Sequence, residues 1–284
     1  RSGYTLSLTN TFNPDKTKFF PKFNWPRIDN PKLQFPVDAA EVQRVSETEA
    51  RALDQVKQAI HQYGDRVAGL IIEPIQSEGG DNHFRPEFMG ALRDLCTEHR
   101  ILFILDEVQT GIGLTGRFWA HEHHGIQPDI ISFGKKTQVC GMLAGPIRDE
   151  VQDNVFQRSM RIGSTFGGNL VDMVRCKRIL EIIESERLVD AAARQGSYLL
   201  AKLQDLQSRF ADRISNVRGQ GLLCAFDLPD PEHKKRFVEK CARARVLVVG
   251  CGPKSIRFRP HLNISTTEID HGMKVLANVL ADMA

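Results

Sequence analysis

The sequence predicts an α/β protein, with a large domain on a mostly parallel sheet followed by a small C-terminal α+β domain. Short apolar runs alternate with helical stretches over residues 46–135. Several of these runs end abruptly in charged or glycine-bearing turns, as the buried strands of a parallel sheet do. From residue 214 onward, short strands and helices follow one another closely. We therefore expect a large domain over residues 1–185 and a small domain over residues 186–284.

Composition narrows the class of protein. The 284 residues are 41% hydrophobic and 26% charged, with a net charge of +3, and this ordinary balance does not favour nucleic acid as a partner. We expect no membrane partner either, because no apolar stretch approaches the roughly 18 residues that a spanning helix needs. The six cysteines have no metal-ligand spacing, so we expect reduced thiols in a cytoplasmic protein.

The N-terminal region is expected to begin with a strand at residues 5–10. Residues 11–38 are rich in proline and aromatic residues, which predicts an ordered excursion packed by its own rings rather than a flexible linker. A helix is predicted over residues 46–63, because apolar residues recur there at helical spacing.

The next segments predict a β–α–β unit. A buried strand over residues 67–72 stops at a polar, glycine-bearing turn over residues 73–80. A helix over residues 84–99, with Pro86 in its first turn, returns the chain to a second apolar run. This alternation is typical of a doubly wound sheet.

Two apolar runs deliver a carboxylate and a lysine to one edge of the sheet. Residues 101–105 lead into Asp106, and residues 130–133 lead through a glycine into Lys135. Ligands of open α/β sheets bind at the carboxyl ends of the strands. A lysine there can hold the aldehyde of pyridoxal 5′-phosphate (PLP) as a Schiff base, while an aspartate keeps the ring nitrogen protonated. Asp106 and Lys135 therefore indicate PLP chemistry, with Gln109 in reach of the ring hydroxyl.

Other interpretations compete at these residues. An apolar run ending in Asp106 also resembles the magnesium-binding strand of a P-loop nucleoside triphosphatase, but Asp129 occupies the place where that loop needs a glycine. Asp106 as a helix cap and Lys135 as a surface lysine is the plainer alternative. Residues 121–124, His-Glu-His-His, carry zinc-ligand types, yet no second ligand pair follows, so we expect no metal.

The remainder predicts the small domain. Ser164 and Thr165 offer hydroxyls to a phosphate just before long helices at 170–186 and 188–210. Strands are predicted near 222–226, 246–249 and 256–260, a helix over 232–243, and a last helix capped by Thr266 or Thr267.

Six motifs in order resemble the class III, fold-type I, PLP-dependent aminotransferases, essentially from end to end: EPIQ (73–76), DEVQTG (106–111), GKK (134–136), STFGGN (164–169), RGQG (218–221) and IRFRP (256–260). Residues 1–11, 20–27 and 133–141 resemble the lysine 6-transaminase subgroup, whereas residues 116–123 lean toward the 4-aminobutyrate transaminases.

The resemblance implies roles for the coenzyme site. Lys135, in the first-lysine place of its motif, would form the Schiff base and act as the base for the proton shift. Asp106 would hold the pyridinium nitrogen, Val108 would pack on the ring, and Gln109 would reach the ring oxygen. Thr165 would contact the coenzyme phosphate of the neighbouring subunit, which implies a homodimer.

It also implies substrate contacts. Arg257 would bind a substrate carboxylate, since arginine pairs with carboxylates bidentately. Glu78 would neutralise Arg257 when the donor presents an amine instead, and Arg1 would bind the carboxylate of the donor. The implied reaction takes L-lysine and 2-oxoglutarate to 2-aminoadipate 6-semialdehyde and L-glutamate.

The front of the chain departs from the family pattern. Such enzymes carry a longer N-terminal part with a phosphate-binding turn and an aromatic that stacks on the ring, so this sequence resembles an N-terminally truncated form with an incomplete large domain. A 4-aminobutyrate or ornithine-type ω-aminotransferase is the first alternative, and a truncated, non-catalytic chain is the second.

Overall fold

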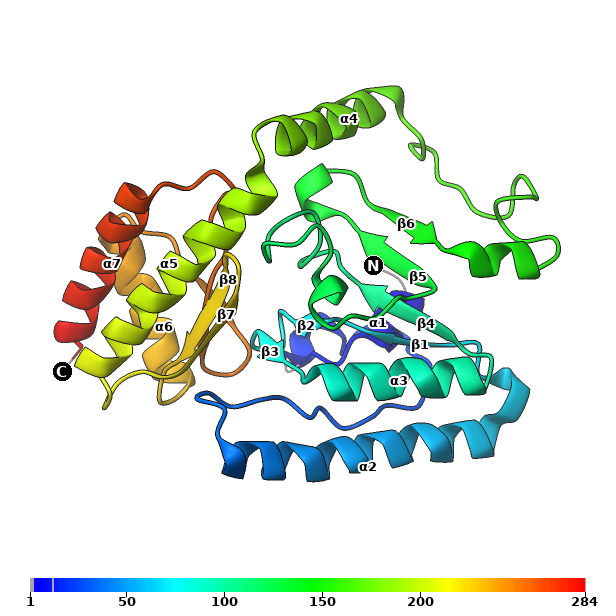
Figure 1. Cartoon of the computed structure of the whole chain (residues 1–284), viewed down its shortest axis with the longest axis horizontal. Helices are drawn as coiled ribbons and strands as arrows, with labels where there is room; N and C mark the ends of the chain where they lie inside the picture. The colour runs from blue at the N-terminus through cyan, green and yellow to red at the C-terminus, as the bar shows by residue number, and fades with distance from the viewer. Residues whose placement is uncertain (1–2, 12, 284) are drawn as a thin grey trace.

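The large domain is organised around a four-stranded sheet of order β1-β4-β5-β6 (Figure 1). The structure, a computed structural model, describes residues 3–11 and 13–283. Strands β1 (Gly69–Ile72), β4 (Leu102–Asp106) and β5 (Ile130–Phe133) are parallel, and β6 (Gly141–Ala144) pairs antiparallel with β5. The mostly parallel sheet expected from the sequence is confirmed.

Two helices cover one face of this sheet. Helix α2 (Ala39–Tyr63) begins earlier than the sequence predicts, because the Asp38 side chain caps it by accepting from Glu41 N at 2.8 Å. Helix α3 (Pro86–Glu98) lies between α2 and the sheet, as Figure 1 shows. Together with β4 they enclose a buried apolar core: Ala52, Val56, Phe84, Phe88, Met89, Leu92, Cys96, Ile101, Phe103, Leu105 and Ile126.

The other face of the sheet is only partly covered by the described residues, so the strands are less buried than the sequence predicts. On that face the side chains of Ile71 and Met142 are exposed. In β4, fully buried residues alternate with half-buried ones, which is the pattern of a strand with one packed face.

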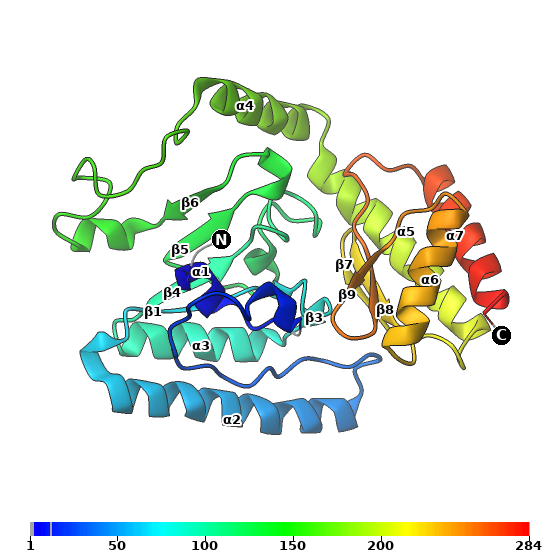
Figure 2. The ribbon, with the colours of Figure 1, turned by 180° about the vertical axis from the view of Figure 1, so that it is seen from behind.

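The predicted N-terminal strand is a short helix instead, α1 (Gly3–Leu8), followed by the 3₁₀ helix η1 (Pro14–Lys16). Ser7 explains the change: its hydroxyl donates to Gly3 O within the helix and accepts from Phe23 N at 2.7 Å. The excursion folds back on α1, which Figure 2 shows from behind. Its rings pack only in part, since Phe19 is exposed whereas Phe23 stacks on Trp25.

The small domain has an antiparallel sheet of order β7-β8-β10-β9, with β7 (Ser215–Gln220), β8 (Leu223–Asp227), β10 (Ser255–Phe258) and β9 (Val249–Cys251). Helices α5 (Leu188–Arg209), α6 (Pro231–Arg243) and α7 (Thr266–Ala281) share one apolar core with it.

Two details of the small domain differ from the sequence prediction. Strand β9 begins at Val249, later than expected, because the chain still turns at Arg245 with a positive φ. Helix α7 is capped by Ser265 rather than Thr266 or Thr267, in a capping box with Glu268.

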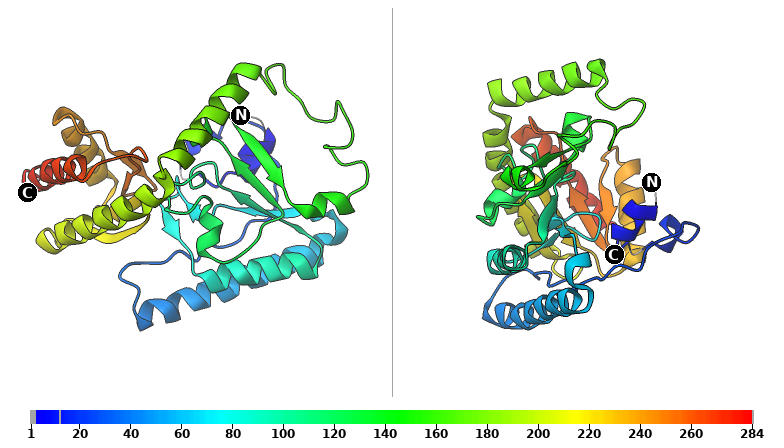
Figure 3. Two further views of the ribbon diagram at one scale, coloured as in Figure 1. Left: turned by 45° about the horizontal axis from the view of Figure 1, so that its top comes forward. Right: turned by 90° about the vertical axis from the view of Figure 1, so that its right-hand side faces the viewer.

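Helix α4 (Leu170–Ser185) connects the two halves. It follows the 3₁₀ helix η5 (Pro146–Glu150) and a largely exposed segment, residues 151–169, which arches away from the sheet in Figure 3. The helical conformation breaks off between α4 and α5, where Arg187 takes a left-handed backbone conformation. The domain boundary proposed at residues 185–186 falls at this break. None of the helices formed by the described residues is both long and apolar enough to span a bilayer.

Candidate active site

The carboxyl end of β4 holds Asp106 in a fixed orientation. Asp106 lies opposite Ser132 of β5 in the parallel register. Its Oδ1 accepts hydrogen bonds from Ser132 Oγ and from Val108 N, both at 3.0 Å. Within the described part of the chain, Oδ2 makes no such bond. One oxygen therefore orients the carboxylate, and the other is available to a donor such as a protonated ring nitrogen.

The two adjacent lysines after β5 differ in their surroundings. The 3₁₀ helix η4 begins at Lys135, whose amine makes no hydrogen bond or ion pair with the described residues. Partial burial and the positive charge of Arg259 lower the pKa of Lys135. The Nζ of Lys136 donates to Gln109 O at 2.6 Å, and burial lowers its pKa to about 7. Lys136 is thus engaged by the backbone, whereas the amine of Lys135 is free to react.

Val108 and Gln109 lie in the turn that follows Asp106. Val108 packs beside Gly134, the residue before Lys135, because a Cβ added to Gly134 would lie 3.4 Å from Val108 Cγ1. Gln109 is buried, and its carbonyl carries the bond to Lys136. The structure therefore brings four predicted coenzyme residues together at one sheet edge: Asp106, Val108, Gln109 and Lys135.

Glu73 is a further ionisable group at this edge, to which the sequence assigned no role. It follows β1, and its Oε2 accepts from Ser77 N at 3.0 Å. Burial raises the pKa of Glu73 to about 7, and the negative charge of Asp106 adds to the effect. The charges of Arg257 and Lys135 act in the opposite direction. Its position directly after a strand was the one available signal.

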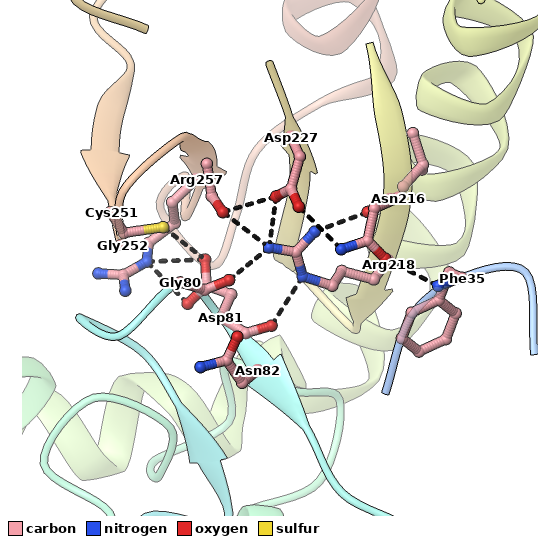
Figure 4. A network of polar contacts seen from close by, with 12 residues as sticks. Phe35, Gly80, Asp81, Asn82, Asn216, Arg218, Asp227, Cys251, Gly252 and Arg257 are labelled. Atoms are coloured by element: carbon pink, nitrogen blue, oxygen red, sulfur yellow. Dashed lines mark hydrogen bonds and ion pairs between the residues drawn. The ribbon is translucent and has the colours of Figure 1, made fainter. Parts of the chain in front are cut away.

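Arg257 reaches this neighbourhood from β10 of the small domain. Its Nε donates to both carboxylate oxygens of Asp81 at 2.8 Å, and Figure 4 shows its terminal nitrogens on the side away from Asp81. A second arginine, Arg218 of β7, donates to Asp81 O at 2.9 Å and to Asp227 Oδ1 at 2.9 Å. These bonds join the turn between β2 (Ile75–Gln76) and β3 (Asn82–His83) to the small domain.

The expected pairing of Glu78 with Arg257 is not what the structure has. Glu78 is largely exposed and forms an ion pair with Lys16 of η1, while the partner of Arg257 is Asp81. Both acids belong to one turn, but Asp81 has a left-handed backbone, with φ of 50°, and points into the junction. The sequence could not decide between two acids three positions apart.

The structure does not bring Thr165 into this cluster. Thr165 is in the exposed segment of residues 151–169, and Arg1 lies outside the described residues.

The zinc-like group at residues 121–124 has structural partners. The 3₁₀ helix η3 (Ala120–His123) sits on Glu107, which accepts from Ala120 N, His121 N and His121 Nδ1 within 2.9 Å. Among the described residues, no cluster of His, Cys, Asp or Glu has the make-up of a metal site.

The aminotransferase class-III family matches residues 1–280. The chain belongs to the class-III aminotransferases. It is 48% identical to an L-lysine-epsilon aminotransferase of Amycolatopsis lactamdurans, over 99% of this chain and 62% of the relative. It is 39% identical to human mitochondrial 4-aminobutyrate aminotransferase, over 92% of this chain and 52% of the relative.

The fold also matches a solved structure of a lysine aminotransferase. Lysine aminotransferase from M. tuberculosis in the internal aldimine form matches with a TM-score of 0.95 and 48% identity, covering 100% of this chain and 64% of that chain. Across the relatives named lysine-epsilon aminotransferase, this chain spans about 62% of their length.

The residues that lie at the carboxyl edge of the sheet fit the ring portion of PLP. A free amine of lowered pKa at Lys135 suits the aldehyde, and the unbonded oxygen of Asp106 suits the ring nitrogen. Val108 provides an apolar side chain beside Gly134, the residue before that lysine. For the phosphate, the expected partner is Thr165, which lies in the exposed segment.

Proposed function

We propose that this protein transfers the ε-amino group of L-lysine to 2-oxoglutarate, giving 2-aminoadipate 6-semialdehyde and L-glutamate, with PLP as coenzyme. The observation that carries the proposal is that a free Lys135 amine and an oriented Asp106 carboxylate lie at the same sheet edge. The choice of lysine as donor rests on the higher identity to relatives named for lysine, 48% against 39%.

The residues of the chain would divide the work as follows. PLP supplies an electron sink for negative charge that develops at the carbon bearing the amine. Asp106 would keep the ring nitrogen protonated, so that this sink remains effective. Lys135 would bind the coenzyme and then move a proton at its Nζ, for which its lowered pKa is suitable.

The substrate would be held from the small domain. Arg257 would bind a carboxylate of 2-oxoglutarate through its terminal nitrogens. Glu78, on the surface of the same turn as Asp81, would act only if it left Lys16. Val108 and Gln109 would contact the ring, and Arg1 would meet the donor carboxylate.

The test compares Lys135→Ala with the adjacent Lys136→Ala. After addition of PLP, the wild-type protein should show the absorbance band of lysine-bound coenzyme, and borohydride reduction should fix the label on Lys135. Lys135→Ala should lose the band and about 100-fold or more of its transamination rate, because it removes the proton-transfer group. Lys136→Ala should keep the label. A label on Lys136, or no band in the wild type, would contradict the assignment.

The amino donor is open to a second candidate. The 39% identity to human 4-aminobutyrate aminotransferase favours 4-aminobutyrate as the alternative substrate. Parallel assays with L-lysine, L-ornithine and 4-aminobutyrate should give the highest kcat/KM for lysine. A higher value for either other donor would transfer the proposal to that donor.

We also propose a homodimer in which Thr165 reaches the coenzyme phosphate of the neighbouring subunit. Large apolar side chains are exposed around Thr165, including Phe166, Leu170 and Val174. The cytoplasmic location stays a prediction from the sequence.

A further inference from the structure

Arg257 is buried where the small domain meets the β2–β3 turn. Its side chain is 7% exposed, and that of Asp81 is 1% exposed. The Nε of Arg257 is shared between both oxygens of Asp81, each at 2.8 Å. Its Nη2 is buried and has no hydrogen-bond partner among the described residues. A buried guanidinium nitrogen without an acceptor is unfavourable and points to an acceptor that arrives from outside the chain.

The turn that carries Asp81 is itself fixed to the small domain. Arg218 donates from Nε to Asp81 O at 2.9 Å and also bonds Gly80 O. The thiol of Cys251 contacts Asp81 Oδ2 at 3.7 Å. The turn packs tightly on the small domain, because a Cβ at Gly252 would lie 2.7 Å from Gly79 O. Asp81 therefore cannot follow a movement of Arg257 without breaking these contacts.

The charge of Arg257 requires a permanent partner. A substrate carboxylate is present for only part of a reaction cycle, and an unpaired buried charge is strongly unfavourable in the interval. Asp81 supplies the counter-charge through Nε, and the terminal nitrogens bond to none of the residues that the structure describes (Figure 4). Those nitrogens are the edge that pairs bidentately with a carboxylate.

We propose that Asp81 is a positioning residue, which fixes Arg257 by its Nε so that its terminal nitrogens face the carboxylate of the 2-oxo acid. This inference rests on the proposed function, because it deepens the substrate contact assigned to Arg257. Glu78 cannot take this part in the present arrangement, since it is 61% exposed and paired with Lys16.

The experiment measures binding of glutarate, a non-reacting dicarboxylate, by calorimetry to the PLP-loaded protein. Asp81→Asn keeps the volume of the side chain but removes its charge. We expect it to weaken glutarate binding about tenfold or more, because a hydrogen bond to a charged group is lost. Glu49→Gln is the matched control, because Glu49 is buried against Arg85 on the outer helix α2. It should bind glutarate like the wild type.

Two further measurements separate positioning from a general loss of structure. Asp81→Asn should raise the KM for 2-oxoglutarate about tenfold while kcat changes less than about threefold. In an Arg257→Met background, where glutarate binding is already weak, Asp81→Asn should have no further effect. A persisting effect in that background would mean that Asp81 acts elsewhere.

The glutarate measurement decides whether Asp81 positions Arg257. Unchanged or tighter glutarate binding by Asp81→Asn would overturn the proposal, tighter binding showing that Asp81 competes with the ligand for Arg257. No glutarate binding by the wild type would also overturn it. Normal Asp81-dependent glutarate binding without transamination of any donor would instead overturn the proposed function and leave the role of Asp81 intact.

Discussion

One sheet edge holds the carboxyl groups of Glu73 and Asp106 and the amine of Lys135. The charges of these three groups act on one another. Burial disfavours the charged forms of Glu73 and Lys135. The raised pKa of Glu73 and the lowered pKa of Lys135 are two consequences of this arrangement.

Glu73→Gln tests this balance through the pH dependence of stability. Burial raises the pKa of Glu73 from 4.5 to about 7, so the folded state binds a proton that the unfolded state has released. The unfolding free energy of the wild type therefore falls as the pH rises from about 4.5 to about 7. Gln does not titrate, so the variant should gain on the wild type between pH 5 and pH 8, by up to about 3 kcal/mol.

Thermal or denaturant unfolding at both pH values measures this difference. Glu87→Gln, which removes an exposed carboxylate at the start of α3, controls for the loss of one acid. A constant difference between Glu73→Gln and the wild type across this range would show that Glu73 is not buried in its charged form.

At the residue scale, the sequence predicts which side chains lie at the carboxyl ends of the parallel strands. Asp106 and Lys135 each follow an apolar run, so their meeting at one edge follows from parallel pairing. The bond between Arg257 and Asp81 joins positions 176 residues apart, and no local pattern encodes it. The role of Glu78 stays a prediction; in the structure Arg257 pairs with Asp81, which has a left-handed backbone, while Glu78 pairs with Lys16.

At the scale of helices and strands, the sequence predicted the long amphipathic helices well, whereas the prediction of an N-terminal strand was wrong. Helices α4 and α5 match their predicted spans closely, because an apolar stripe over many turns identifies a helix. The short segment of α1 carries no such stripe, and contacts with the later excursion decide its structure. Strand β7 was missed because its glycine and polar residues hide the strand pattern.

Close backbone packing at α5 gives a prediction at this scale. A Cβ at Gly196 of α5 would lie 2.1 Å from Gly221 C, in the turn between β7 and β8, and backbone cannot give way there. Gly196→Ala should therefore lower the unfolding free energy by about 3 kcal/mol or more. Gly272→Ala in α7 meets no atom within 4 Å and should raise it by about 0.5–1 kcal/mol.

Chemical denaturation of the two variants under identical conditions gives both values. The contrast isolates packing, since each substitution adds one methyl group to a helix. Equal effects of the two variants would show that α5 does not rest on the turn as closely as the structure indicates.

For the whole molecule, the candidate site depends on how the two domains are joined. The large domain supplies Asp106 and Lys135, and the small domain supplies Arg257. Arg218 and Asp81 bond across the same junction. The proposed substrate contact from one half of the chain is thereby tied to the proposed coenzyme contacts from the other, and no local sequence pattern predicts this junction.

The exposed apolar side chains near Thr165 give the last prediction, on assembly. Leu170 at the start of α4 is 80% exposed, and Phe166 just before it is 77% exposed. If this surface forms the proposed dimer, Leu170→Glu buries an unpaired charge in the interface. It should raise the dimer dissociation constant about tenfold or more and weaken PLP binding, because Thr165 would no longer reach the neighbouring coenzyme.

Sedimentation velocity over a range of protein concentrations, with PLP titrations at each, measures both effects. Leu247→Glu is the matched control, since Leu247 is 90% exposed but lies in the small domain just before β9. It should leave the assembly unchanged, because a charge on a solvent-facing side chain needs no partner. A wild-type protein that sediments as a monomer, or equal dissociation by the two variants, would remove residues 166–174 from the interface. If PLP binding does not depend on protein concentration, the proposed contact of Thr165 with the neighbouring coenzyme is contradicted, even if a dimer forms.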